Sequence, residues 1–93
     1  MAALKELDPR HGELKSMHTA ATARRRGVGR AIVDHLLAVA AARGARRVSL
    51  ETGTMEAFAP ARSLYAGVGF VPCGPFGDYP ESSTSAFMTR VLG

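Results

Sequence analysis

The sequence predicts one α/β domain, residues 1–93, with a mixed β-sheet, two helices and the element order ββαβαββ. A long helical pattern of apolar residues between two β-prone segments indicates a parallel strand–helix–strand unit. A turn signal near the N-terminus predicts a hairpin before this unit, and a shorter helical pattern follows it. With 93 residues, 46% hydrophobic and 22% charged, the chain has material for one core.

The first two strands are expected to form a hairpin. Residues 2–7 mix apolar and polar types, and residues 8–12 combine a proline with a glycine that would supply a positive φ angle. In residues 13–19, polar and apolar residues alternate, which places Leu14 on one face of the strand and Glu13 on the other.

The long helix is expected over about residues 27–43, ended by Gly44, because glycine readily adopts the left-handed conformation. The β-prone residues 48–51 then predict a strand parallel to residues 13–19. The apolar residues of the helix recur at helical spacing: Val28, Ile32, Val33, Leu36, Leu37, Val39 and Ala40.

The second helix is expected to start near Pro60 and to end at Gly69. Residues 70–72 predict a short strand, residues 73–85 a loop rich in proline, glycine and serine, and residues 86–92 a final strand. Four residues share the apolar face of this helix: Ala61, Leu64, Tyr65 and Val68.

Positive charge is concentrated in one short segment. The chain carries 12 basic and 8 acidic residues, a net charge of +4. Four arginines fall between positions 24 and 30: Arg24, Arg25, Arg26 and Arg30. Such a cluster favours an anionic partner.

Several classes of protein are disfavoured by what the sequence lacks. The single cysteine, Cys73, excludes an intramolecular disulfide and a zinc site built on paired cysteines, so we expect no metal and a structural thiol. No apolar run approaches the roughly 18 residues of a membrane span, and no secretory signal opens the chain. These observations predict a cytoplasmic protein with no membrane partner.

Two glycines, Gly27 and Gly29, lie where the long helix begins. The first turn of a helix offers unpaired N–H groups and positive potential, and glycines let an anion approach the backbone. No Lys-Ser or Lys-Thr pair follows, which excludes a Walker loop, and the bulky Ile32 disfavours a dinucleotide fingerprint. The remaining pattern is Arg/Gln-x-x-Gly-x-Gly/Ala, matched by Arg24, Gly27 and Gly29.

This motif resembles the central motif of the GNAT family of acyl-CoA N-acyltransferases. Residues 61–70 are similar to the family's second signature, Ala-x-x-Leu-Tyr-x-x-x-Gly-Phe. The resemblance covers nearly the whole chain and implies a partial GNAT fold, because the family's first strand, its following helices and a further strand come before the hairpin. Phe58 departs from the pattern, since many members carry there an asparagine that reaches the cofactor.

The resemblance implies acetyl-CoA as the cosubstrate. The backbone of Met17 and Thr19 would contact its pantetheine arm and acetyl group. The pyrophosphate would bind the segment made of Arg24, Arg25, Arg26, Gly27, Val28, Gly29, Arg30 and Ala31.

The expected reaction is transfer of the acetyl group to a primary amine of a small molecule or a protein, by direct attack. Tyr65 matches a family tyrosine that can protonate the departing thiolate, a role that suits a neutral phenol with a pKa of about 10. Glu13, eleven residues before Arg24, is the first candidate for the general base. An exposed ion pair with Lys15 or Arg47 is the ordinary alternative for Glu13, and Glu51 is the second candidate.

Two other functions compete with this interpretation. The chain would bind coenzyme A without catalysis if the elements before the hairpin were needed for the acceptor. Nucleic-acid binding through the arginines is disfavoured, because no recognition motif or aromatic platform accompanies them. We also expect a homodimer, because residues 2–7 would form an open edge strand that invites pairing with another chain.

Overall fold

The computed structural model describes residues 2–16 and 26–92 of the chain. The order of elements confirms the predicted ββαβαββ arrangement and adds a short 3₁₀-helix. The elements are β1 (Ala2–Asp8), β2 (His11–Ser16), α2 (Arg26–Ala42), β3 (Arg47–Gly53), η1 (Glu56–Phe58), α3 (Ala59–Gly67), β4 (Val71–Cys73) and β5 (Ser85–Val91).

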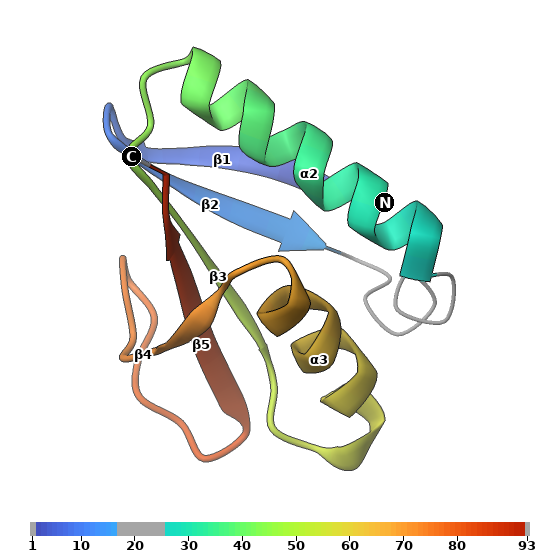
Figure 1. Cartoon of the computed structure of the whole chain (residues 1–93). Helices are drawn as coiled ribbons and strands as arrows, with labels where there is room; N and C mark the ends of the chain where they lie inside the picture. The colour runs from blue at the N-terminus through green and yellow to red at the C-terminus, as the bar shows by residue number, and fades with distance from the viewer. Residues whose placement is uncertain (1, 17–25, 93) are drawn as a thin grey trace.

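The five strands form one mixed sheet in the order β1-β2-β3-β5-β4. β2 and β3 are parallel and are connected through α2, whereas the other neighbouring strands are antiparallel (Figure 1). The predicted parallel strand–helix–strand unit is therefore confirmed. Among the described residues, no helix is long and apolar enough to cross a membrane.

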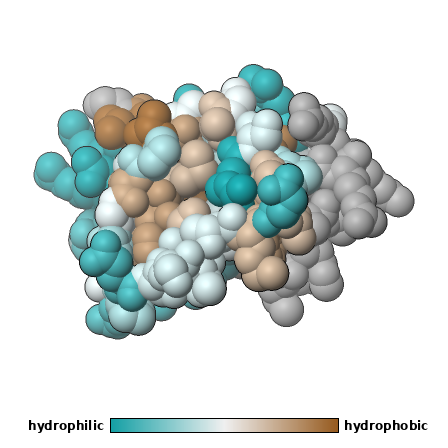
Figure 2. All heavy atoms as spheres, turned by 90° about the horizontal axis from the view of Figure 1, so that it is seen from below, coloured by the Kyte–Doolittle hydropathy of each residue, from teal (hydrophilic) through white to brown (hydrophobic). Residues whose placement is uncertain are grey.

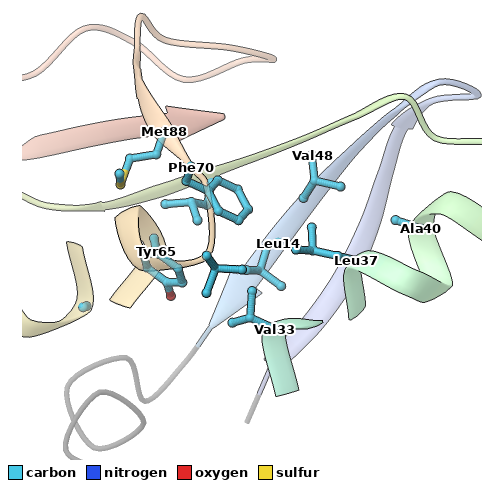
Figure 3. Close-up of a cluster of buried hydrophobic side chains, with 11 residues drawn as sticks. Leu14, Val33, Leu37, Ala40, Val48, Tyr65, Phe70 and Met88 are labelled. Atoms are coloured by element: carbon cyan, nitrogen blue, oxygen red, sulfur yellow. The ribbon is translucent and has the colours of Figure 1, made fainter. Parts of the chain in front are cut away.

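The core lies between one face of the sheet, here called the helix face, and the two helices that cover it (Figure 1). Strand residues at alternate positions point toward the helices, as the strand period requires. The core cluster is shown in Figure 3 and consists of Leu14, Val33, Leu37, Ala40, Val48, Leu50, Ala61, Tyr65, Val68, Phe70 and Met88. The predicted apolar face of α3 is confirmed, because all four of its residues are buried.

The buried stripe of α2 is narrower than the sequence predicts. Val33 and Leu37 are only 3% and 5% exposed, whereas Ile32 is 38% exposed. The stripe follows the spacing i, i+4, i+7 through Val33, Leu37 and Ala40, which face the sheet. The helix is apolar over more than half of its circumference, so the sequence pattern alone did not locate the centre of the face.

The end of α2 and the hairpin turn differ in how well the sequence predicts them. Gly44 has φ of 94°, which confirms its role after the helix. The hairpin turn consists of Pro9 and Arg10, and Gly12 lies inside β2 without a positive φ, so its predicted role in the turn is wrong. A Cβ at Gly12 would lie 3.3 Å from the side chain of Leu4, so close packing explains a small residue there.

The opposite face of the sheet, here called the polar face, carries the strand residues Glu13, Ser49 and Thr89, all buried. It is covered by residues 74–84, the β4–β5 segment. The ring of Phe76 lies 5.9 Å from that of His11, and Phe76 and Tyr79 each lie 5.7 Å from Phe87. Seen from below, apolar side chains on the side of β4 and β5 are interrupted by hydrophilic ones (Figure 2).

Candidate functional site

The parallel strands β2 and β3 diverge toward their carboxyl ends (Figure 1). Their last paired position is Leu14 with Leu50, yet β2 continues to Ser16 and β3 to Gly53. Among the described residues, Glu51 and those after it therefore have strand partners only on the β5 side. Along this edge the described residues leave backbone donors and acceptors of β3 available to a ligand with amide groups.

The first turn of α2 lies beside this divergence, close to the end of β2 (Figure 1). It contains no acidic residue that would neutralise the positive end of the helix dipole. A Cβ added at Gly27 would meet no atom of the described residues within 4 Å, whereas Gly29 is buried. The first N–H groups of any α-helix lack partners within the helix, so a helix start of this kind suits an anion.

The predicted pyrophosphate segment is described only in part. Met17, Thr19, Arg24 and Arg25 lie outside the described residues. Arg26 is the first residue of α2, and Val28 also belongs to this helix. Arg30 and Ala31 are exposed, and Arg30 Nε lies 3.8 Å from Asp34 Oδ2 one turn later. The structure thus brings Gly27, Gly29, Arg30 and Ala31 to the start of the helix, as predicted.

Tyr65 lies on the other side of the divergence, on the helix face. It is 4% exposed, and its ring packs edge-on against Phe70 at 5.9 Å. Its hydroxyl group points away from the centre of the core, on the side of the carboxyl end of β2 (Figure 3). Tyr65 is therefore both a packed aromatic and a phenol directed toward the end of the sheet where the strands diverge.

Arg62 ties the start of α3 to the end of β3. Its Nη1 donates hydrogen bonds to the carbonyl oxygens of Gly53, at 2.5 Å, and Met55, at 3.1 Å. The ring of Phe58 lies against Gly53 so closely that a Cβ there would clash with it. These contacts fix the position of the helix that carries Tyr65. This role of Arg62 was not predicted, because the residue lies inside a helical pattern and nothing in the sequence marks its backbone partners.

Glu13 lies on the polar face and is 2% exposed. Tyr79 donates its hydroxyl hydrogen to Glu13 Oε2 at 2.6 Å. Lys15 Nζ lies 3.7 Å from the same oxygen and donates to the Tyr79 hydroxyl at 3.2 Å. The expected pair with Lys15 exists, but Glu13 is buried rather than exposed. The contact with Tyr79 was not predicted, because this residue lies 66 positions from Glu13 in a loop without a motif.

The hydrogen bonds of this cluster change the acidity of its members. The pKa of Lys15 is raised, first by its bond to Tyr79 and then by the charge of Glu13. The pKa of Tyr79 is raised chiefly because its hydrogen bond to the Glu13 carboxylate favours the neutral phenol. Tyr79 and Lys15 therefore stay protonated around neutral pH: Tyr79 donates to Glu13, and Lys15 donates to Tyr79 and forms an ion pair with Glu13.

Glu51, the second candidate base, lies just beyond the last β2–β3 pair. It is exposed, and Ser85 donates a hydrogen bond to its Oε2 at 2.8 Å. By strand alternation it shares the polar face with Glu13. Both carboxylates thus lie on one face of the sheet and Tyr65 on the other.

Other reactive side chains are engaged elsewhere. Burial raises the pKa of the Cys73 thiol, which does not favour a thiolate nucleophile. Ser49 Oγ lies 2.6 Å from His11 Nε2 and 2.9 Å from Thr89 Oγ1, which donates to the Val48 carbonyl. A chain of donors from His11 through Ser49 to Thr89 satisfies every group, so Ser49 serves a structural network.

The described residues contain no group of three metal-binding side chains.

The sequence is similar to known acetyltransferases. A profile described as the acetyltransferase (GNAT) family matches residues 1–70. The uncharacterized N-acetyltransferase YsnE of Bacillus subtilis is 53% identical over 90 residues, which are 97% of this chain and 60% of that protein. The uncharacterized N-acetyltransferase YedL of Escherichia coli is 48% identical over 92 residues, 99% of this chain and 58% of that protein.

A third relative and two solved structures agree with this similarity. A protein named IAA acetyltransferase, from Azospirillum brasilense, is 38% identical over 82 residues, 88% of this chain and 52% of that protein. A structure described as an acyl-CoA N-acyltransferase from Klebsiella pneumoniae superposes with a TM-score of 0.83 and 26% identity, covering 99% of this chain and 62% of that one.

An acetyltransferase structure from Streptococcus agalactiae shares the fold, with a TM-score of 0.78 and 24% identity over 98% of this chain and 58% of that one. The chain spans 52–60% of the length of the three curated relatives.

Proposed function

The chain belongs to the acetyltransferase (GNAT) family, and on that premise we propose that it transfers an acetyl group from acetyl-CoA to a primary amine. One observation carries the proposal: two parallel strands diverge beside the start of a helix whose first turn contains no acidic residue. The partial GNAT fold, an α/β structure with a mixed five-stranded sheet, supplies the frame.

The backbone around the divergence suits two parts of acetyl-CoA, the pantetheine arm and the pyrophosphate. The unpaired edge of β3 beyond Leu50 offers hydrogen bonds to the amide groups of the pantetheine arm, for which Met17 and Thr19 are the proposed partners on the other side. The first turn of α2 would bind the pyrophosphate through its N–H groups, with Arg24, Arg25 and Arg30 adding charge.

The candidate acid and base lie on opposite faces of the sheet, and this arrangement fits direct attack. The amine nitrogen would form a bond to the acetyl carbon as the carbon–sulfur bond breaks. Tyr65, on the helix face, would give its hydroxyl proton to the departing thiolate, and Glu13, on the polar face, would take the proton of the amine. No covalent enzyme intermediate forms, in keeping with a protonated Cys73.

The experiment is titration of the chain with acetyl-CoA, compared with Gly27→Glu. The added carboxylate projects into the open space at the start of α2, so the dissociation constant should rise at least about tenfold, about 1.4 kcal/mol. The fold should hold, because glycine is a poor helix former and an acidic residue suits a helix N-terminus. Ala38→Glu, an exposed position farther along α2, is the control and should bind as the unchanged chain does.

Release of the thiol in the presence of amines then separates an enzyme from a domain that only binds coenzyme A. Binding that is equal in Gly27→Glu and Ala38→Glu would overturn the proposed pyrophosphate site. Binding without release for any amine would favour the binding-only alternative. The homodimer and the cytoplasmic location stay predictions, and the mass of the chain in solution tests the first of them.

A further inference from the structure

A second cluster of positive charge lies at the amino ends of the parallel strands β2 and β3, opposite to the divergence. His11 and Arg47 form the first pair of these strands, whereas Leu14 and Leu50 form the last. An open cavity of about 400 Å³ lies at this end of the sheet. Three arginines, one acidic residue and two further side chains line it: Asp8, Arg10, His11, Arg46, Arg47 and Val91.

The backbone that carries the three arginines is fixed by hydrogen bonds. The carbonyl oxygen of Arg10, in the hairpin turn, accepts from the N–H groups of Arg46 at 2.7 Å and Arg47 at 3.2 Å. The carbonyl oxygen of Arg46 accepts from the N–H group of Leu92, which follows β5, at 2.8 Å. The three arginine side chains therefore start from neighbouring points of a fixed backbone.

The positive charge of this cluster is not balanced. Among the described residues, no acidic group lies within ion-pair distance of the three guanidinium groups. Asp8 is the one acidic side chain of the described lining, and its Oδ1 accepts a hydrogen bond from the backbone N–H group of Arg10 at 2.8 Å. All three arginines are exposed, so water weakens their mutual repulsion, and an anion bound between them would remove it.

The chemistry of guanidinium groups favours a phosphate as that anion. Each guanidinium group presents a planar fork of N–H donors that can bond two oxygens of one phosphate. A phosphate group carries about two negative charges near neutral pH and has enough acceptor oxygens for more than one fork. A carboxylate carries a single charge on its two oxygens and satisfies one fork.

We propose that this cavity is a binding site for a phosphate group, free or carried by a small molecule, and that Arg10, Arg46 and Arg47 hold it. The site is separate from the proposed pyrophosphate site at the start of α2, and it does not depend on acetyl transfer. Arg10 belongs to the hairpin and Arg47 to β3, so a bound phosphate connects the hairpin to β3 and stabilises the folded chain.

The test follows the side-chain Nε–H NMR signals of the three arginines during titration with inorganic phosphate at constant ionic strength. These signals should shift and saturate, and acetate should bind at least about fivefold more weakly. Arg47→Met should raise the dissociation constant of phosphate at least about fivefold. Lys5→Met removes the same charge from an exposed residue outside the lining and should leave that constant unchanged.

Two further titrations identify the source of the phosphate and separate this site from the start of α2. Tighter binding of glycerol phosphate than of inorganic phosphate would indicate a group carried by a small molecule, and equal binding a free one. Gly27→Glu changes only the start of α2, so the arginine signals should respond to phosphate as they do in the unchanged chain.

A second readout is the free energy of unfolding in phosphate. Phosphate stabilises folded proteins in general through exclusion from their surface, so the variants are compared with one another. The gain in stability should be larger for the unchanged chain and Lys5→Met than for Arg47→Met. Equal binding of phosphate and acetate, or equal binding by Arg47→Met and Lys5→Met, would overturn the site. Saturation by a single-stranded oligonucleotide without a response to phosphate would overturn it in favour of a nucleic-acid surface.

Discussion

The two faces of the sheet are built in different ways. The helix face is an apolar cluster whose members recur at helical or strand spacing along the chain. The polar face is held by side-chain hydrogen bonds between residues 38, 40 and 66 positions apart, namely His11 with Ser49, Ser49 with Thr89 and Tyr79 with Glu13. The difference indicates that stability is concentrated on the helix face, whereas the ionisable groups of the proposed chemistry gather mainly on the polar face.

The largest effect on the free energy of unfolding is expected for one of two neighbouring residues on β3. Leu50 and Ser49 are 1% and 2% exposed, but they point to opposite faces. Leu50→Ala leaves a cavity in the core and should lower the free energy of unfolding by about 2–5 kcal/mol. Ser49→Ala removes the hydrogen bonds of Ser49 to His11 and Thr89. His11 then bonds to solvent and Thr89 still donates to the Val48 carbonyl, so the free energy of unfolding should fall by about 1 kcal/mol. Urea unfolding measures both.

The same measurement has an internal control on α2. Ile32→Ala should cost less than Leu50→Ala, because Ile32 is 38% exposed. If Ser49→Ala or Ile32→Ala destabilised the fold as much as Leu50→Ala, stability would not be concentrated in the core of the helix face.

An intermediate effect is expected at Gly53, where β3 leaves the sheet toward α3. Gly53→Ala places a methyl group in the ring of Phe58 and should cost about 1–3 kcal/mol. In a Phe58→Ala background the same change should cost clearly less, because the clash is gone. A double-mutant cycle of unfolding free energies checks this, and purely additive costs would contradict the proposed contact.

The smallest effect is expected for Tyr79→Phe, which keeps the ring but removes the bond to Glu13. The free energy of unfolding should fall by about 1 kcal/mol near neutral pH. The raised pKa values of Tyr79 and Lys15 mean that the folded chain holds these protons more tightly than the unfolded chain. Their stabilisation is therefore complete below about pH 10 and is lost as the pH rises through the folded values.

Two titrations check this pH dependence. The ultraviolet absorbance of phenolate, taken as the difference between the unchanged chain and Tyr79→Phe, should report a Tyr79 pKa above the ordinary value. Unfolding of Tyr79→Phe should lose less stability in alkali than unfolding of the unchanged chain. An ordinary pKa for Tyr79 would indicate that the bond to Glu13 is absent in solution.

Local patterns explain how much of the fold the sequence predicts. Helical spacing, strand alternation and Gly44 act over a few residues, so the element order and the parallel pair are predicted correctly. The role of Gly12 was wrong because its size is set by Leu4 across the hairpin. The centre of the apolar face of α2 was missed because that helix is broadly apolar.

The candidate site also has a part that local patterns predict and a part that they do not. The start of α2 and the position of Tyr65 follow from two local motifs, and the structure places both beside the divergence. The burial of Glu13 and its bond to Tyr79 depend on a segment that returns across the sheet after 66 positions. No pattern within one element carries that information.

The short pairing between β2 and β3 also makes the connection between two parts of the molecule weak. Only the positions from His11 with Arg47 to Leu14 with Leu50 join the two strands, whereas β3 and β5 pair along their whole length, from Arg47 to Gly53. The chain therefore consists of two parts joined by a short strand pairing: the β1–β2 hairpin with α2, and the β3–β5–β4 sheet with α3. We expect the backbone amides of the hairpin and α2 to exchange with deuterium earlier than those of the β3–β5–β4 sheet. A ligand bound between the two parts should slow that exchange in both.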